Sequence, residues 1–277
     1  MRQITGKELL EFGLVQIFLK ALGVTADPFG DVGTFLQDLW KADPRSRSTQ
    51  DIPRHMLEQS TATVAATVES ATMALAEFFR MTDESETPLV GDYDLLIAPT
   101  GSARQAPRQR ARHAVDAILR GDATAGIIVG VGSSRRLNEK EQLDVENYAP
   151  GALIELDLVA AASREIATAL PKTVVATCFV DNERAGNDDI LSAVIEGVRR
   201  FSQPPYPISI AAVTTQIYRW SLDLDLRRIA ARYGIGRTFV AGNASNREVI
   251  AKRSLETYIT ENLRNIRAAR LAAAAGV

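Results

Sequence analysis

The chain has 277 residues, of which 46% are hydrophobic and 24% are charged, and its formal net charge at pH 7 is −2. This composition is typical of a soluble globular protein and argues against an extensively disordered one. The near-neutral charge gives no overall attraction to nucleic acid or to an anionic membrane, so any positive site must be local.

Residues 1–86 are predicted to be helical. The segments 6–24 and 63–81 place apolar residues at helical spacing, whereas 26–33 and 42–53 contain the Pro and Gly of loops. The acidic segment MTDESETPLVGD then reads as a linker. We therefore predict two domains, a helical region at 1–86 and an α/β domain at 92–277 that ends in a long C-terminal helix.

After residue 92, short apolar runs alternate with longer amphipathic stretches, which is typical of βαβ units and a mostly parallel sheet. Strands are predicted near 93–98, 126–131, 173–180, 207–213 and 237–241. Helices are predicted near 106–120, 138–147, 158–170, 187–202, 217–233 and 245–273. The segment 151–158 fits either a short strand or the start of the next helix, and both alternatives stay open.

Cysteine and histidine usage limits the chemistry that the chain can carry. Cys178, the single cysteine, excludes an internal disulfide, and two histidines, His55 and His113, disfavour a His/Cys zinc site. Cys178 lies within the apolar run VVATCFV, so we expect a buried, inert thiol. Charged residues interrupt the N-terminal apolar stretch and no run of 18 uncharged apolar residues follows, so we expect a cytoplasmic protein without a membrane span.

Small polar residues and arginines follow the predicted strands. In parallel sheets the carboxyl ends of the strands and the N-termini of the following helices converge on one crevice, where exposed backbone amides and arginine forks bind anions. We therefore predict a site for a small anionic ligand. Its predicted ligand-binding residues are Thr100, Gly101, Ser102, Arg104, Gly132, Ser133, Ser134, Arg135, Asn187, Thr214, Thr215, Tyr218 and Arg219.

Arginine is concentrated around the first two strand ends. Residues 101–136 hold seven arginines against two carboxylates. Arg104 is the best-placed contact because it lies in the loop, and Arg135 also follows a strand. The arginines of the next helix, Arg108, Arg110 and Arg112, cannot all face one pocket, and a solvated helix face is the alternative for such residues.

Familiar nucleotide-binding and hydrolase motifs are missing here. The spacing of Gly126, Gly130 and Gly132 is not G-x-G-x-x-G, and neither a P-loop nor G-x-S-x-G occurs. Gly130 and Gly132 fit either ligand approach or relief of crowding. The serines at the strand ends are interpreted as anion contacts or helix caps before nucleophiles.

Carboxylates supply the candidate acid–base groups. Glu139 and Glu183 are predicted as a general base or a metal ligand. The loop DNERAGNDD, at 181–189, holds enough carboxylate oxygens to bind Mg²⁺ with a phosphate, but Asp188 and Asp189 also suit the first turn of a helix. Metal binding is therefore left open and is not expected.

Residues 93–242 resemble the ElyC/SanA/YdcF-like family of Rossmann-like domains, whose biochemistry is largely unassigned. The similar segments are YDLLIAPTGS with the following Arg110, GIIVGVGSSRRLNEKE with Glu139, NERAGNDDIL with Glu183, and ISIAAVTTQIYRWSLDLDLRRIAARYGI. Tyr218 stands nearest to the family's histidine, and Gly101 replaces its double glycine. The resemblance implies a Rossmann-like fold in a bacterial protein and a polar pocket for a nucleotide-like or phosphorylated ligand, such as S-adenosylmethionine.

Two functions fit these observations. The first is binding, with or without chemical conversion, of a small anionic or nucleotide-like metabolite at the strand ends. The alternative is a non-catalytic metabolite-sensing or assembly protein whose helical N-terminal region forms an interface, for example in a homodimer. Nucleic acid is not an expected partner, because the basic cluster is local and lacks interleaved aromatic residues.

Overall fold

The computed structural model describes residues 4–43, 62–82, 84–101, 104–183, 185–201, 208–245 and 247–277. Contacts divide the chain into two compact units. The α/β unit is Glu86–Ala244, and the helical unit combines Met1–Ser85 with Ser245–Val277. The boundary between Ser85 and Glu86 lies inside the acidic segment that we predicted to be a linker.

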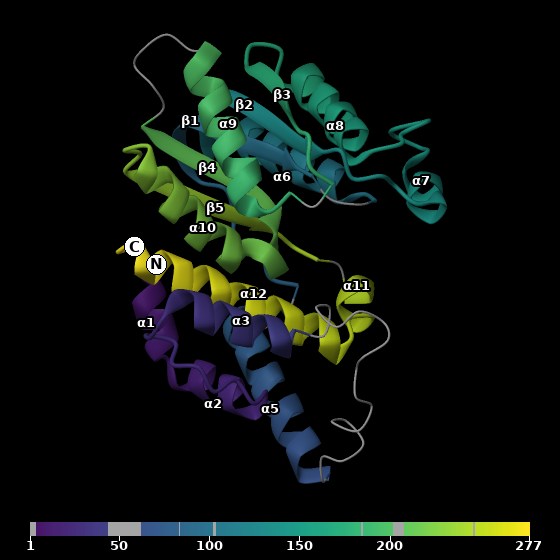
Figure 1. Ribbon diagram of the computed structural model, residues 1–277. Coiled ribbons are helices and arrows are strands. Elements are labelled where there is room, and N and C mark those ends of the chain that lie inside the picture. The colour runs from purple at the N-terminus through teal and green to yellow at the C-terminus, as the bar shows by residue number, and fades with distance from the viewer. Residues whose placement is uncertain are drawn as a thin grey trace. The chain divides into compact units, whose positions relative to one another are not determined.

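The described part of the α/β unit contains a five-stranded sheet with the order β3-β2-β1-β4-β5 (Figure 1). All neighbouring strands are parallel. Each strand overlaps its predicted range, so the predicted α/β, Rossmann-like class is confirmed. The strands are β1 (Gly91–Thr100), β2 (Ala123–Ser133), β3 (Val174–Val180), β4 (Ser209–Thr215) and β5 (Arg237–Asn243).

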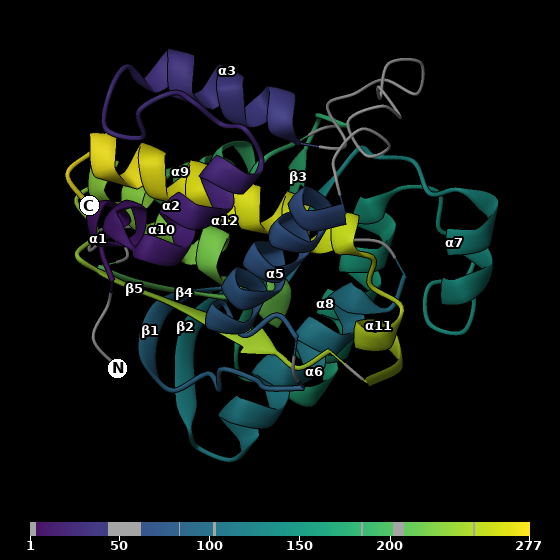
Figure 2. The ribbon, with the colours of Figure 1, turned by 90° about the horizontal axis from the view of Figure 1, so that it is seen from below.

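Helices cover both faces of this sheet (Figure 1). On one face lie α6 (Ala106–Leu119) and α8 (Glu155–Ala169), and on the other lie α9 (Asn187–Phe201) and α10 (Arg219–Arg232). A short helix, α7 (Glu139–Val145), lies at the rim beyond α8 (Figure 2), and a 3-10 turn, η2 (Gln216–Tyr218), joins β4 to α10. Connections of this kind bring all strand ends to one edge.

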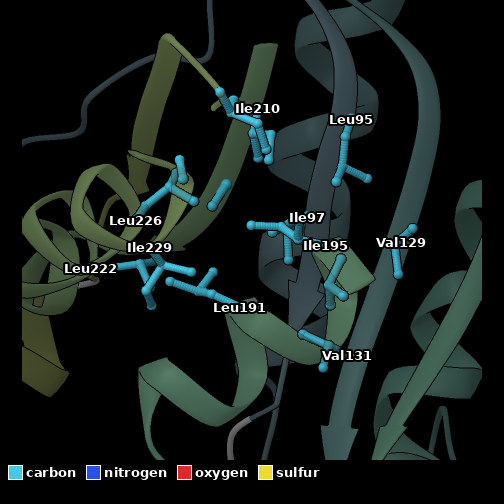
Figure 3. Packing of buried hydrophobic residues seen from close by; sticks show 14 of the residues in the cluster. Leu95, Ile97, Val129, Val131, Leu191, Ile195, Ile210, Leu222, Leu226 and Ile229 are labelled. Carbon is cyan, nitrogen blue, oxygen red and sulfur yellow. The ribbon is translucent and has the colours of Figure 1, made fainter. Parts of the chain in front are cut away.

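Apolar side chains on the two sheet faces explain why the central strands read as continuous hydrophobic runs. Leu95 and Ile97 of β1 belong to one core with Leu191 of α9 and Leu222 of α10 (Figure 3). Between them, Leu96 packs in the opposite core, together with α6 and α8. A strand buried on both faces needs no polar alternation, so β1 and β4 form the rigid centre of the sheet.

The edge strand β3 differs from our expectation for Cys178. Val174 and Phe179 are exposed, and Cys178 itself is only half-buried. Burial nevertheless raises the pKa of the Cys178 thiol, which disfavours the reactive thiolate. The prediction of a fully buried thiol was wrong, because an apolar run cannot distinguish a central strand from an edge strand.

In the helical unit, α12 packs against α1, α3 and α5. This grouping differs from the predicted division, which placed the C-terminal helix with the α/β domain, because sequence proximity does not reveal packing partners. The predicted helix at 6–24 breaks at Phe12, and that at 245–273 breaks where Ser254 caps α12. The helices are α1 (Gly6–Glu11), α2 (Gly13–Ala21), α3 (Val32–Ala42), α5 (Ala62–Phe78), α11 (Arg247–Ala251) and α12 (Leu255–Ala274).

Among the described helices, none has the length and apolar character needed to cross a membrane. Most of the predicted loop at 42–53 lies outside the described residues.

Candidate functional site

The sheet order reverses at β1, because the chain builds β2 and β3 on one side of it and β4 and β5 on the other. Ligands of open parallel sheets bind at such a switch point, beyond the carboxyl ends of the strands. Here the two strand ends are Thr100 of β1 and Thr215 of β4. Register places Thr100 beside Val131 of β2, and Thr215 beside Asn243 of β5.

The guanidinium of Arg110, on α6, joins these strand ends. Its Nη1 donates to the Thr100 carbonyl at 3.0 Å, to Thr100 Oγ1 at 2.7 Å and to the Gly101 carbonyl at 3.2 Å. Its Nη2 donates to Thr215 Oγ1 at 3.2 Å. The side chain therefore holds the β1 and β4 loops at a fixed separation.

The position of Arg110 on its helix explains its burial. Pro107 lies in the first turn of the helix, and Arg110 shares the buried face with Ala114 and Ala117, four and seven residues later. Its helix neighbours behave differently: Arg108 pairs with Glu165 at 2.8 Å, and Arg112 is exposed. Of these three arginines, Arg110 contacts the strand ends, which agrees with the prediction that they cannot all face one pocket.

Arg110 is a buried cation with neutral neighbours. Only 3% of the residue is exposed. Among the described residues, no carboxylate oxygen pairs with it within 4.0 Å, and none accepts a hydrogen bond from its Nε. Burial lowers its pKa to about 10, although the Glu155 carboxylate acts in the opposite direction, so the group stays charged at neutral pH.

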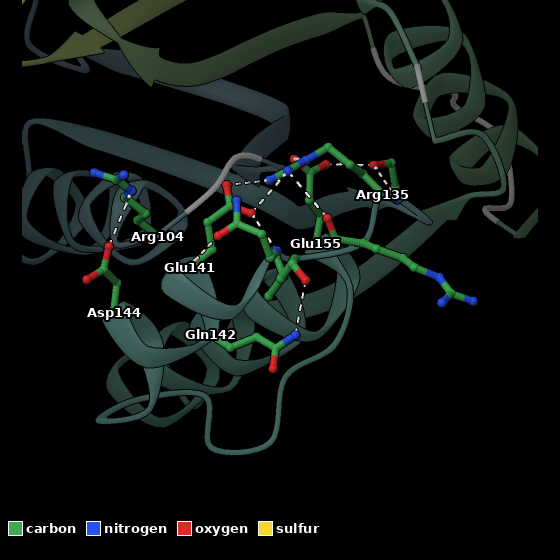
Figure 4. Close-up of polar contacts among 10 residues, drawn as sticks. Arg104, Arg135, Glu141, Gln142, Asp144 and Glu155 are labelled. Carbon is green, nitrogen blue, oxygen red and sulfur yellow. Dashed lines mark hydrogen bonds and ion pairs between the residues drawn. The ribbon is translucent and has the colours of Figure 1, made fainter.

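A second arginine cluster lies at the end of β2 (Figure 4). Arg135 Nε donates to Glu155 at 2.7 Å, and its Nη1 donates to Glu141 at 3.2 Å. Ser133 Oγ donates to the other oxygen of Glu155 at 2.6 Å. The predicted anion contacts Ser133 and Arg135 are thus brought together, but both are bound to carboxylates of the chain itself.

The ion pairs within this cluster shift the pKa values of Glu141 and Arg135. Although burial opposes the effect, the Asn138 amide and the Arg135 guanidinium hold the pKa of Glu141 below its ordinary value. Burial likewise opposes the charge of Arg135, yet its bonds to Glu155 and Glu141 raise its pKa. The ion pair with Arg135 therefore favours the ionised form of Glu141.

Sequence reasoning missed both carboxylates of this cluster, Glu141 on α7 and, further along the chain, Glu155. Glu155 opens α8, and its backbone N–H donates to the Arg135 carbonyl at 3.0 Å. The adjacent Ile154 forms an isolated bridge with Arg136. The segment 151–158, for which two alternatives were left open, therefore combines a single β-bridge with the start of a helix. A prediction that the helix begins at residue 155 would have drawn attention to the Glu155 carboxylate.

Close packing explains the glycines at this edge. A Cβ on Gly101 would lie 3.1 Å from Glu155 Oε2, and one on Gly132 would lie 2.7 Å from the Leu156 Cα. A Cβ on Gly130 would lie 2.4 Å from Ser163 Oγ. Gly130 and Gly132 are therefore explained by the close approach of α8, which leaves no room for a Cβ at either position. Gly101 lies between Arg110, which contacts its carbonyl, and Glu155 of the Arg135 cluster.

Arg104 lies apart from Arg135 and points toward Asp144 (Figure 4). Its side chain is 56% exposed and pairs with Asp144 at 3.3 Å, and its backbone has a left-handed φ of 59°. Tyr148 donates its hydroxyl hydrogen to the Arg104 carbonyl at 2.7 Å. The geometry thus gives Arg104 a surface contact with α7, through Asp144.

The other predicted residues divide between the edge and the surrounding helices. Thr214 is buried, Ser134 donates its N–H to the Val180 carbonyl at 3.2 Å, and Arg219 donates to the Val240 carbonyl at 3.1 Å. Tyr218 is the last residue of η2, which joins β4 to α10. Ser102 lies outside the described residues.

The start of α9 contacts α10 through polar side chains, and the acidic loop before α9 is closed by a hydrogen bond of its own. Asn187 donates to Asp225 at 2.8 Å, Asp188 pairs with Arg228, and Asp189 accepts from the Gly186 N–H at 3.0 Å. Burial raises the pKa of Asp225 despite its bonds to Asn187 and Arg228.

The predicted bases Glu139 and Glu183 are both exposed. Within the described ranges, no group of three or more His, Cys, Asp or Glu residues lies in a metal-binding arrangement.

A scan against protein-family models and a search of curated proteins found no match for this chain.

Proposed function

We propose that this chain binds a small anionic metabolite, carrying a phosphate or a carboxylate, at the ends of β1 and β4. Arg110 is the cationic anchor of this site, and the Thr215 hydroxyl and the Gly101 loop supply neutral contacts. The observation that carries the proposal is a buried guanidinium whose described partners are all neutral oxygens, located where the sheet order reverses.

The physical argument rests on the cost of burying charge. Removing an unpaired ion from water costs several kcal/mol even after relaxation, and hydrogen bonds to carbonyls and hydroxyls offset only part of this. A bound anion would offset the rest, and the positive N-terminal end of α6 would add to the attraction. The Arg135 cluster, at the same edge of the sheet, needs no such ligand, because Arg135 already pairs with two carboxylates, Glu141 and Glu155.

The proposal concerns binding. Glu139 and Glu183 are exposed and make no described contact with Arg110, so they give no support for a base acting on a ligand at that residue. The resemblance to the ElyC/SanA/YdcF-like family is retained as part of the proposal, since a nucleotide-like or phosphorylated ligand would present the anionic group that Arg110 requires.

The test is isothermal titration of the full chain with ethylphosphonate and with inorganic phosphate. The variant Arg110→Met should lose about tenfold to hundredfold in affinity, because a hydrogen bond to a charged group contributes about 1.5–3 kcal/mol. The matched control is Arg120→Met at the exposed end of the same helix, where Arg120 pairs with Asp122 at 2.7 Å. Its affinity should equal that of the parent.

Thr215→Val provides a milder variant that keeps the shape of the side chain and should weaken binding about fivefold. A folded Arg110→Met protein that binds both anions as tightly as the parent would contradict the proposal, and so would a parent that binds neither.

A further inference from the structure

The strand β3 is an unprotected edge of the sheet (Figure 1). It pairs with β2 in a continuous register from Val174 to Val180, and its sequence VVATCFV contains no charge, proline or glycine. Val174 is 61% exposed and Phe179 is 48% exposed. Edge strands of this kind readily pair with another strand, and most proteins block them with charges, proline, bulges or a covering segment.

The opposite edge strand, β5, has such protection. Thr87 and Gly242 exchange both of their backbone hydrogen bonds, at 2.8 and 3.0 Å, on the side of β5 that faces away from β4. A charged residue, Arg237, begins the strand. The two edges are therefore not equivalent, and β3 is the edge at which a further strand can add.

The direction of the backbone groups identifies the residues of β3 that face outward. The Ser134 N–H, just beyond β2, donates to the Val180 carbonyl at 3.2 Å. Because the backbone groups of successive strand residues alternate between the two sides, those of Val175, Thr177 and Phe179 point away from β2. In the part of the chain that the structure describes, no segment outside the sheet forms a backbone hydrogen bond with these three residues.

Charges at the two ends of β3 favour a second copy of the chain in the antiparallel direction. Lys172 precedes the strand and Asp181 follows it, both are exposed, and within the described ranges neither forms an ion pair. An antiparallel pairing places the Lys172 end of one copy beside the Asp181 end of the other, whereas a parallel pairing in the same register would bring like charges together. The strand between them is uncharged, so no charge repels an identical strand.

We propose that two copies of this chain pair antiparallel through β3, about a two-fold axis at Thr177. In this register Thr177 lies opposite Thr177 of the other copy and Val175 lies opposite Phe179, so each outward backbone group of these residues gains a partner. The exposed Val174 then lies opposite Val180. The two sheets form one continuous sheet, and the assembly closes at two copies because the β5 edge is protected. This inference is independent of the anion site at β1 and β4.

Sedimentation velocity of the full chain, from about 1 to about 200 μM, tests the pairing. We expect a reversible dimer, because one pair of strands buries too little surface for an obligate interface. Thr177→Lys should raise the dissociation constant about tenfold or more, since it places two lysines directly opposite each other at the axis. Thr177→Val is the matched control: it keeps the shape of the side chain and the backbone N–H, and its dissociation constant should stay within about twofold of the parent.

Thr177→Pro is a second variant at the same position. It removes one outward N–H in each copy and should weaken the dimer about tenfold, from the loss of two hydrogen bonds. The hydrogen bonds between β2 and β3 stay intact, because the Thr177 N–H points away from β2. Far-UV circular dichroism checks that each variant is folded, and if one of the two fails to fold, the other decides.

The flanking charges test the direction of the pairing. Lys172→Glu should weaken the dimer about threefold to tenfold, because like charges then meet at both ends of the paired strands. Adding Asp181→Lys should return the dissociation constant to within about threefold of the parent. A single variant that associates as tightly as the parent, or a double variant no tighter than the single one, would overturn the antiparallel direction.

A parent that stays monomeric up to the highest concentration would overturn the inference and leave β3 open to an extended segment of another protein. A dimer that persists undiminished in folded Thr177→Lys or Thr177→Pro would overturn the assignment to β3 and place the interface elsewhere, for example in the helical region.

Discussion

Arg110 and Arg135 lie at the same edge of one sheet but have opposite surroundings. Arg135 donates to two carboxylates, Glu141 and Glu155, whereas the described partners of Arg110 are a carbonyl pair and two hydroxyls. Arg135 is also partly accessible, while Arg110 is buried. The comparison shows that a high density of arginines in the sequence indicates only the part of the chain in which an anion site could lie. The partners of each arginine then decide which guanidinium lacks a carboxylate and is available to an anionic ligand.

The largest expected effect concerns stability at the balanced cluster. Arg135→Met leaves two carboxylates facing each other with little exposure, and we expect a loss of about 2 kcal/mol in the free energy of unfolding, measured by urea denaturation. Adding Glu155→Gln should recover part of the loss. Affinity for ethylphosphonate should stay within twofold of the parent, and a loss of tenfold would show that Arg135 binds the anion.

The next effect is the pH dependence of anion binding at Arg110. Its pKa is lowered to about 10, so the positive charge present at neutral pH is lost as the pH rises through that value. Phosphate affinity, measured by titration, should fall by up to about tenfold between about pH 9 and about pH 11. The residual affinity of Arg110→Met should lack this fall. A parent affinity that is constant over the range would contradict the assignment.

A smaller effect is expected in acid at Glu141. Its pKa lies below the ordinary 4.5 in the folded chain, so its stabilising contribution is complete above that value and is lost as the pH falls through the folded pKa. Glu141→Gln should therefore lose less stability than the parent between about pH 6 and about pH 3, by about 1 kcal/mol. Parallel curves for the two proteins, obtained by urea denaturation, would count against the ion pair.

The smallest effect should come from Arg104, which the sequence placed first among the ligand contacts. Its ion pair with Asp144 is exposed, and such pairs contribute about 0–1 kcal/mol. Arg104→Ala should change the free energy of unfolding by less than about 0.5 kcal/mol and leave phosphonate affinity within twofold. A tenfold loss of affinity would restore Arg104 to the site.

The fold was predictable because its signals are local and repeated. β1 and β4 read as continuous apolar runs because they are buried on two faces. The helices between the strands read as amphipathic because they are buried on one face. The prediction that the ligand site lies at the carboxyl ends of the strands follows from the parallel arrangement of the sheet. Cys178 shows the limit, since its exposure depends on which strand lies at the edge, and that is a property of the topology.

The site was only partly predictable, because partners come from distant segments. Thr100 and Thr215 were predicted from their place after strands, and both contact Arg110. That arginine falls on the apolar stripe of Ala114 and Ala117, which is a detectable signal. Glu155, twenty residues after Arg135 and on a different element, accepts a hydrogen bond from its guanidinium. No local sequence pattern predicts a contact over that separation.

The most direct test is a crystal structure of the full chain with ethylphosphonate. The account predicts the phosphonate at the ends of β1 and β4, with oxygens within hydrogen-bond distance of the Arg110 guanidinium and the Thr215 hydroxyl. A phosphonate bound between Arg104 and Arg135 instead, with Arg110 still contacting neutral oxygens alone, would contradict it.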